Sequence, residues 1–254
     1  MKVSGHTSVY LRKIAAVFDP LLCLVYPRQC QVCGGNVEDH AHGAACGECW
    51  NAAKLFSGAE TLCYKCGAFL SDASSVNESF CRRCDDHHYD RARAVGQYHG
   101  SLRAAVVALK SSPDLSESIR TRLLESFSSF GLADADVIIP VPLSKKRYLE
   151  RGYNQAAVIG SFLSVETAIQ FDGASLERTV HTPMHRVGMD RKAREITVKK
   201  AFSVVRPRLL QGRSVVLVDD VLTSGATASA CARILKKNGS GRVSVFTLAR
   251  AVYS

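Results

Sequence analysis

The sequence has no apolar run long enough to cross a membrane. The most apolar early stretch, residues 14–26, is too short for a span and contains Asp19 and Pro20. No small-residue cleavage site follows it, so the sequence predicts neither a membrane anchor nor a signal peptide. We therefore expect a cytoplasmic protein. In that reducing compartment, its 10 cysteines favour metal ligation over disulfides.

Acidic residues are scarce compared with basic ones. The 254 residues include 23 Asp and Glu against 33 Lys and Arg, which gives a net charge of +10. The excess is uneven, because the span from Lys145 to Arg213 holds 14 basic and 6 acidic residues. Such a charge favours anionic partners such as a diphosphate, a nucleotide or a nucleic-acid backbone. Diffuse basicity also keeps proteins soluble, so nucleic-acid binding needs independent support.

Eight of the cysteines form four Cys-x-x-Cys pairs in two similar blocks, residues 30–49 and 63–84. Two thiolates on a tight knuckle can grip Zn²⁺, and two knuckles close a tetrahedral site of four sulfurs. A glycine follows the first pair of each block and lets the backbone turn towards the metal. The predicted zinc ligands are Cys30, Cys33, Cys46, Cys49, Cys63, Cys66, Cys81 and Cys84.

We expect two structural zinc ions, because all the ligands are cysteines and no position is left open for water. Which pairs share a metal is open at this level. The alternative reading, buried free thiols or redox pairs, is disfavoured because isolated Cys-x-x-Cys motifs rarely repeat in this way. Four nearby histidines are interpreted as surface residues: His40, His42, His87 and His88.

The stretch Val215–Thr227 reads VVLVDDVLTSGAT and carries the strongest functional signal. Its four leading apolar residues do not alternate, which predicts a strand buried on both faces of a parallel sheet. Asp219 and Asp220 follow at the carboxyl end, where open α/β sheets bind ligands. The loop 223–227 then leads into a helix predicted over 228–237, so its backbone N–H groups can hold a phosphate.

Carboxylates one sugar-length from a phosphate cradle predict a ribose 5-phosphate pocket. The carboxylates accept hydrogen bonds from vicinal ribose hydroxyls, and the loop holds the phosphate. The alternative is an ordinary strand, loop and helix with two surface aspartates. The predicted contacts are Asp219, Asp220, Thr223, Ser224, Gly225, Ala226 and Thr227.

A second buried strand is predicted over Val137–Pro142, and a basic loop follows it up to Gln155. Several donors at the end of a strand suit a diphosphate better than a monoester, because they can spread over its charge. A solvated basic loop is the alternative. The expected diphosphate ligands here are Lys145, Lys146, Arg147, Arg151 and Asn154.

The rest of the pattern adds strands and helices around these two motifs. Strands are expected over 94–98 and 243–248, and helices over 102–109, 116–130 and 155–163. Ser116 is expected to cap the second of these helices. The polar, basic stretch from Arg178 to Phe202 is expected to form a mobile loop or lid between two strands.

Two resemblances follow from these motifs. Val215–Thr227 looks like the signature of type I phosphoribosyltransferases. A strand ending in PVP, a basic loop and RGYNQ, all behind paired cysteine knuckles, resembles the ComF family over roughly residues 20 to 250. The resemblance implies a type I phosphoribosyltransferase-like parallel α/β sheet flanked by helices, preceded by a small Cys-rich double zinc-ribbon module. The predicted parts are residues 1–29, the ribbon at 30–85 and the phosphoribosyltransferase-like domain at 94–254.

The resemblance also implies the ligand. Asp219 and Asp220 would bind the ribose hydroxyls of phosphoribosyl diphosphate, and the loop 223–227 would hold its 5-phosphate. Mg²⁺ would bridge the diphosphate and ribose oxygens, and Arg194 in the lid would close over the diphosphate. No residue stands out as a general base and nothing identifies an acceptor. Binding is therefore a firmer expectation than turnover.

Three functions compete at this level. The first is an accessory role in DNA uptake and natural transformation, with single-stranded DNA bound by the zinc module and contacts to an uptake helicase or recombination proteins. The second is a metabolic phosphoribosyltransferase with an undefined acceptor. The third is a non-catalytic zinc-ribbon adaptor. Aromatic residues that could stack on bases occur in the zinc module, although they also suit a core.

Overall fold

The computed structural model of the chain describes residues 26–57, 60–70, 80–81, 84–179 and 201–252. Residues 1–25, most of the expected lid and the predicted ligand Arg194 lie outside these ranges. Among the helices in the described ranges, none combines the length and apolar character that a membrane crossing requires.

The centre of the fold is a five-stranded sheet whose neighbouring strands all run parallel in the described residues. The predicted parallel α/β architecture is therefore confirmed. In spatial order, the strands are β1 (Arg91–Gln97), β7 (Val243–Arg250), β6 (Val215–Leu222), β2 (Val137–Pro140) and β3 (Gln170–Phe171).

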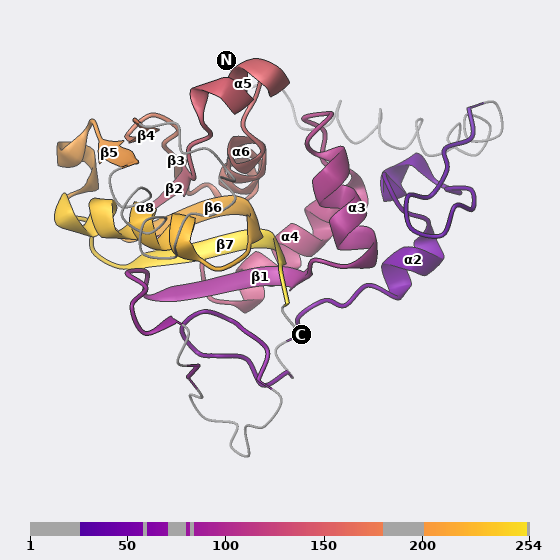
Figure 1. The fold of residues 1–254 in the computed structure, drawn as a ribbon, viewed down its shortest axis with the longest axis horizontal. Helices are drawn as coiled ribbons and strands as arrows, with labels where there is room; N and C mark the ends of the chain where they lie inside the picture. The colour runs from indigo at the N-terminus through magenta and orange to yellow at the C-terminus, as the bar shows by residue number, and fades with distance from the viewer. Residues whose placement is uncertain (1–25, 58–59, 71–79, 82–83, 180–200, 253–254) are drawn as a thin grey trace, which may run out of the picture.

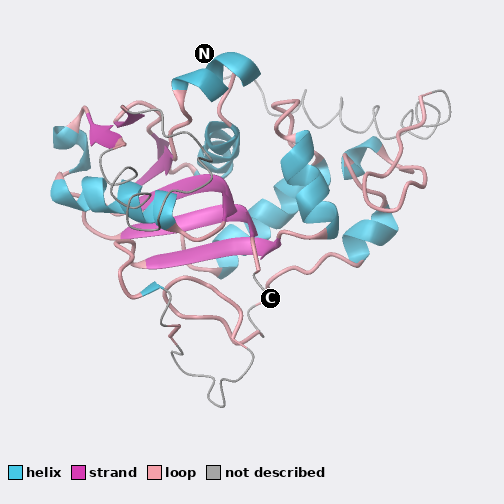
Figure 2. Ribbon diagram, viewed as in Figure 1, coloured by secondary structure: helices cyan, strands magenta, loops and turns pink. Residues whose placement is uncertain are grey.

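Helices cover both faces of this sheet (Figures 1 and 2). Successive residues of β6 point to opposite faces: Val216 and Val218 pack in one hydrophobic core, and Val215 and Leu217 in another. Because β6 is enclosed on both sides, its apolar run does not alternate. The first core is covered by α3 (Gly100–Ala108), α4 (Glu117–Ser129) and α6 (Gln155–Thr167), and the second by α8 (Ala226–Lys237).

The order of the strands reverses between β6 and β2. From β6 the chain passes through α8 to β7 on one side, whereas from β2 it passes through α6 to β3 on the other side. Open parallel sheets bind ligands in the crevice at such a switch point, outside the carboxyl ends of the strands. The two functional motifs predicted from the sequence follow these two strands.

The basic segment after β2 is a helix, not the predicted loop. Helix α5 spans Lys145–Arg151, and the Ser144 hydroxyl caps it by accepting a hydrogen bond from the backbone N–H of Arg147 at 3.4 Å. Gly152 ends the helix with a φ of 78°, a left-handed conformation that favours glycine. The seven residues of α5 have no apolar stripe and therefore no helical period. The two capping residues were the available sequence signal for this helix.

Other predicted boundaries shift slightly. Strand β6 runs on to Leu222, so Asp219 and Asp220 lie within the strand and not beyond its end. Ser116 does occupy the N-cap of α4, but its side chain makes no capping hydrogen bond, contrary to expectation. A side chain at Gly43 would meet the Ser116 side chain at 2.6 Å, so this hydroxyl is packed against the zinc ribbon.

The expected lid is flanked by two short antiparallel strands, β4 (Leu176–Arg178) and β5 (Phe202–Val204). Their pairing joins the chain on either side of residues 180–200, which lie outside the described ranges. The 3-10 turn η3 (Pro207–Leu210) then leads to β6.

The two cysteine blocks pack on different parts of the sheet domain (Figure 1). The first block contains η1 (His40–His42) and α2 (Gly47–Asn51), and its Trp50 belongs to the core under α3 and α4. In the second block, Cys63, Cys66 and Cys84 belong to the core under α8. Between them, residues 54–56 hydrogen-bond to the outer edge of β1, which protects that edge strand.

Candidate functional site

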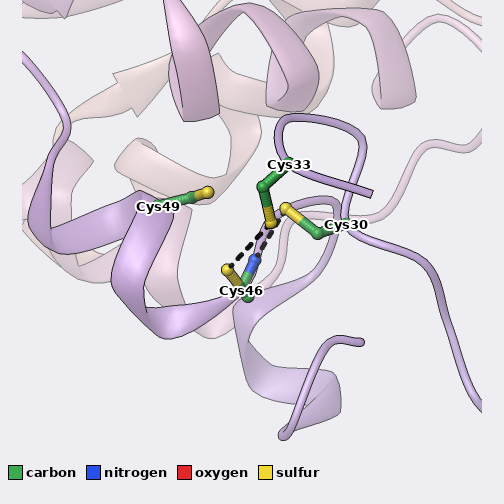
Figure 3. A group of neighbouring side chains, drawn as sticks. All are labelled: Cys30, Cys33, Cys46 and Cys49. Carbon is green, nitrogen blue, oxygen red and sulfur yellow. Dashed lines mark hydrogen bonds between the residues drawn. The ribbon is translucent and has the colours of Figure 1, made fainter. Parts of the chain in front are cut away.

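The four cysteines of the first block lie together in one group (Figure 3). The sulfurs of Cys30, Cys33, Cys46 and Cys49 all lie within 4.8 Å of one another. The backbone N–H groups of Val32 and Cys46 donate to the Cys30 sulfur at 3.4 and 3.3 Å. Gly34 has a φ of 78°, which supports the predicted turn after the first pair.

The second block forms an equivalent group. The sulfurs of Cys63, Cys66, Cys81 and Cys84 also lie within 4.8 Å of one another. Gly67 has a φ of 66° and turns the first knuckle, as predicted. The pairing that the sequence left open is therefore settled, because each block contributes one group of four and no pair is exchanged between them.

Both groups fit tetrahedral zinc. Zn–S bonds of about 2.3 Å towards the corners of a tetrahedron place the sulfurs about 3.8 Å apart. The separations are 3.8 Å for Cys33 and Cys46, and 3.6 Å for Cys63 and Cys84. A hydrogen bond from the Cys66 thiol lowers the pKa of Cys63 to about 4, whereas the same pairing raises the pKa of Cys66 and burial raises that of Cys84. The four sulfurs of each group, at these separations, form a donor set consistent with a structural zinc ion.

The acid pair and the phosphate loop lie where β6 ends and α8 begins. Asp219 accepts a hydrogen bond from the backbone N–H of Asp220 at 2.9 Å. In the loop, Thr223 and Ser224 are exposed, whereas Gly225 is buried, has a φ of 80° and forms the N-cap of α8. The first N–H of α8, at Ala226, donates to the Ser224 hydroxyl at 3.4 Å. The loop thus combines exposed hydroxyls with a helix N-terminus, which suits a phosphate.

Asp219 is the more perturbed of the two carboxyl groups. Part of the residue reaches the surface, but protein surrounds its carboxyl group. This desolvation, followed by the neighbouring charge of Asp220, raises the pKa of Asp219 well above its ordinary value. A carboxyl group whose pKa is perturbed by burial and by a neighbouring charge is typical of a ligand site.

The predicted diphosphate ligands follow β2, the strand that pairs with β6. The Val141 backbone N–H donates to the Val218 carbonyl at 2.8 Å, so β2 ends beside Val218, while β6 runs on to Leu222. Among the basic residues of α5, Lys146 lies 3.9 Å from Glu150, and Arg151 donates to Gln155 at 2.9 Å. Lys145 and Arg147 are the two other basic side chains of the helix.

Asn154 has a structural role in the described geometry. Its side-chain N–H donates to the Val141 carbonyl at 3.0 Å, and its side-chain oxygen accepts from the Ala156 N–H at 3.1 Å. The amide therefore ties the end of β2 to the start of α6. Its predicted contact with a diphosphate stays a prediction, as do those of Lys145, Lys146, Arg147 and Arg151.

Sequence reasoning missed Arg178, the last residue of β4. Burial lowers its pKa, as does the positive charge of Arg147, while Asp219 acts in the opposite direction. Its guanidinium lies 5.4 Å from the centre of the Phe202 ring. Arg178 thus interacts electrostatically with a residue of the basic helix and with one of the acid pair. Its position at the start of a basic stretch was the available signal, but only the strand pairing brings it to the crevice.

A cavity of about 1030 Å³ opens beside α5, between that helix, α6 and β4. Tyr148, Tyr153 and Phe171 give it aromatic walls, and Lys145 and Arg178 supply positive charge. Pro140 of β2 and Phe171 of β3 also line this hollow, whereas the acid pair and the loop 223–227 do not.

The second ribbon also carries an exposed aromatic platform. Tyr64 is 41% exposed and Phe80 is 56% exposed, and their ring centres lie 5.6 Å apart. The Arg91 guanidinium lies 5.5 Å from the centre of the Tyr64 ring. Exposed rings beside a cation suit base stacking. We call Tyr64, Phe80 and Arg91 the aromatic platform.

Fold and sites together define a class of protein: a double zinc ribbon with two groups of four cysteines, followed by a parallel α/β domain. The family description "double zinc ribbon domain" matches residues 21–86.

The chain belongs to the ComF family. It is 31% identical to DNA utilization protein YhgH of Escherichia coli O157:H7 over 219 residues, covering 83% of this chain and 92% of that protein. It is 29% identical to Competence protein F of Haemophilus influenzae, over 88% of this chain and 97% of that protein. Competence protein ComFC of Bacillus subtilis is 27% identical over 80% of this chain and 89% of its own length.

Solved structures resemble the chain more distantly. The glutamine phosphoribosylpyrophosphate amidotransferase of B. subtilis, complexed with ADP and GMP, has a TM-score of 0.36 and 18% identity, over 68% of this chain and 32% of that chain. An adenine phosphoribosyltransferase has a TM-score of 0.33 and 15% identity, over 54% of this chain and 68% of that chain.

Proposed function

We propose that the chain binds phosphoribosyl diphosphate in the crevice between β6 and β2, and acts in DNA uptake and natural transformation. The first half rests on the geometry of the crevice. The second half is supported by family membership, because relatives carry the names DNA utilization protein and competence protein.

One observation carries the ligand assignment. At the switch point of the sheet, β6 carries an acid pair and leads into a phosphate loop, and its neighbour β2 leads into a basic helix. These groups match the three parts of the ligand. The carboxylates of Asp219 and Asp220 would accept the ribose hydroxyls, and the loop 223–227 would hold the 5-phosphate. Lys145, Arg147 and Arg178 would face the diphosphate.

Chemistry at such a site depends on positioning and charge. When diphosphate leaves C1 of the ribose, positive charge develops on the sugar and negative charge grows on the leaving group. The basic side chains would stabilise the leaving diphosphate, while the carboxylates would orient the ribose. Mg²⁺, when bound with the ligand, would supply further charge neutralisation. No acceptor is assigned, so the proposal concerns binding before turnover.

The aromatic platform supports a nucleic-acid partner. A net charge of +10 alone is weak support, but here two exposed rings of the second zinc ribbon lie beside Arg91, the first residue of β1. Single-stranded DNA can stack its bases on such rings irrespective of sequence, while basic groups follow its backbone. We therefore place the DNA contact on the second ribbon.

Calorimetric titration tests both halves. The zinc-loaded protein is titrated with phosphoribosyl diphosphate and Mg²⁺, with and without a single-stranded oligonucleotide. Saturable binding with a stoichiometry of one, altered when DNA is present, is expected. Binding that ignores DNA would contradict the link to DNA and favour a metabolic enzyme, and no binding at all would contradict the ligand assignment.

A further inference from the structure

The second ribbon and the phosphate loop meet at two side chains. Three residues after the last cysteine of the block, the His87 backbone N–H donates to the Cys84 carbonyl at 3.0 Å. The His87 ring nitrogen Nδ1 and the Tyr89 hydroxyl lie 2.6 Å apart, and Tyr89 is only 1% exposed. A Cβ atom at Gly225 would come within 2.8 Å of both the Tyr89 oxygen and the His87 ring. The loop therefore rests directly on this pair.

The contact continues along α8. The His88 backbone N–H donates to the Ser229 hydroxyl at 3.0 Å, in the first turn of the helix. At the other end, the Lys236 amino group lies 2.5 Å from the Asp90 carboxylate, which also accepts the Val243 N–H at 2.7 Å. The segment 87–90 is thus bonded near both ends of the helix that begins in the phosphate loop.

A second connection runs through β7. The Arg250 guanidinium donates to the Cys66 carbonyl at 2.5 Å and lies 3.6 Å from the Cys66 sulfur. Arg250 is the register partner of Leu222 in β6, the residue immediately before the loop. The second cysteine block therefore supports the loop at two places: Arg250 pairs with the residue before the loop, and His87 and Tyr89 pack against Gly225 in its middle.

The first cysteine group has no such contact in the described residues. Its Cys49 carbonyl accepts from the Ser101 hydroxyl of α3 at 2.6 Å. Its Trp50 ring lies 4.6 Å from the Arg122 guanidinium of α4. These helices cover the opposite face of the sheet from α8. The two groups, similar in sequence, are therefore attached to different parts of the fold.

We infer that metal at Cys63, Cys66, Cys81 and Cys84 holds the phosphate loop in its binding conformation, and that metal at the first group does not. His87 and Tyr89 are the positioning residues between the second metal site and the loop. A structural metal contributes the folding free energy of its own ribbon. When it leaves, the support under Gly225 is lost and the loop must be ordered by the ligand itself. The binding measurement below rests on the proposed ligand site, whereas the zinc and hydrogen-exchange measurements do not.

The test compares the two groups in one chain. Cys63→Ser with Cys66→Ser is matched to Cys30→Ser with Cys33→Ser, and zinc content is measured by mass spectrometry. Each variant should retain one of the two zinc ions. The first pair should weaken ribose 5-phosphate binding about tenfold, as expected if one loop in ten remains competent. The second pair should leave binding within about twofold.

A milder variant keeps the test decisive if the cysteine variants fail to fold. Tyr89→Phe removes one hydroxyl, should keep both zinc ions, and should weaken ribose 5-phosphate binding several-fold. Tyr98→Phe, at the far end of β1, is the control. Equal weakening by both cysteine pairs, or no effect of the second-group variants, overturns the inference.

Hydrogen exchange separates this inference from the proposed function. With no ligand present, amides of residues 223–229 should exchange faster in the Cys63→Ser, Cys66→Ser variant than in the wild type. In the Cys30→Ser, Cys33→Ser variant their exchange should be unchanged. If the wild-type protein binds no ribose 5-phosphate, the proposed function fails while this difference still decides the inference. Unchanged exchange in the second-group variant overturns it.

Discussion

Pro140 in β2 and Val218 in β6 are register partners in the parallel sheet. This single pairing places the chain that follows each strand at the same edge. Asp219 comes next in β6, and the segment leading to the basic helix α5 follows Pro140. Two motifs that are distant in the sequence are thereby brought to the same edge of the sheet by neighbouring strands.

Arg178→Gln should weaken phosphoribosyl diphosphate binding about 10- to 150-fold, because removing a charged hydrogen-bond donor from an anion site costs about 1.5–3 kcal/mol. Arg178 interacts electrostatically with both Arg147 and Asp219, so its charge acts on both sides of the proposed site. Calorimetry measures the change. Arg208→Gln is the control, because Arg208 is exposed in η3, before β6 begins. Equal affinities for the wild type and Arg178→Gln would contradict the role of this arginine.

Gly225→Ala should abolish ligand binding and lower the melting temperature. Its φ of 80° is unfavourable for alanine, and the new methyl group would overlap the His87–Tyr89 pair. Gly131→Ala measures the effect of backbone strain without steric overlap, because Gly131 has a φ of 63° and open space around its Cβ position. Both variants should lose stability, measured by thermal melting, but Gly225→Ala should lose more. A smaller loss than in Gly131→Ala would contradict the tight contact.

Asp219→Asn should stabilise the ligand-free protein, increasingly so as the pH rises. Desolvation raises the Asp219 pKa above its ordinary value, so the folded chain holds this proton more tightly than the unfolded chain. The stability linked to that proton is present below the ordinary pKa and is lost as the pH rises through the folded pKa. Asparagine stays neutral throughout.

Melting temperatures between roughly pH 5 and 8 test this. The difference between Asp219→Asn and the wild type should grow towards higher pH. Asp114→Asn is the exposed control and should show no such trend. A difference that shrinks with rising pH would show that the carboxylate is stabilised in the fold.

Tyr64→Ala with Phe80→Ala should weaken single-stranded DNA binding at least about tenfold, because stacking contributes about 1–3 kcal/mol per base. Fluorescence anisotropy of a labelled oligonucleotide measures the affinity. Tyr26→Ala is the control, since Tyr26 is also an exposed tyrosine, at 70%, but lies ahead of the first ribbon. If the control variant lost as much affinity as the double variant, the aromatic platform would not be the DNA contact.

Local pattern alone predicted part of the fold. Four spaced cysteine pairs and an unalternating apolar run before Asp219 have few other physical meanings, so the zinc ribbons and the central strand could be recognised. Helix α5 was missed because Lys145–Arg151 has no apolar period, and its caps at Ser144 and Gly152 are weak signals alone.

The rest depended on contacts between distant segments. His87 was interpreted as a surface histidine, and only the fold brings it under Gly225. Arg178 reaches the crevice because β4 pairs with β5 on the far side of the expected lid. The pairing of the cysteines was also undecidable from spacing, since each Cys-x-x-Cys could have met a knuckle of either block.

In the function that we propose, phosphoribosyl diphosphate binds between β6 and β2 and is held there by the acid pair. Calorimetry on the zinc-loaded Asp219→Asn, Asp220→Asn variant tests this most directly, with zinc content measured in parallel. We predict that binding disappears while both zinc ions remain, because the cysteine groups lie outside the acid pair. Wild-type affinity in this double variant would contradict the assignment of the site.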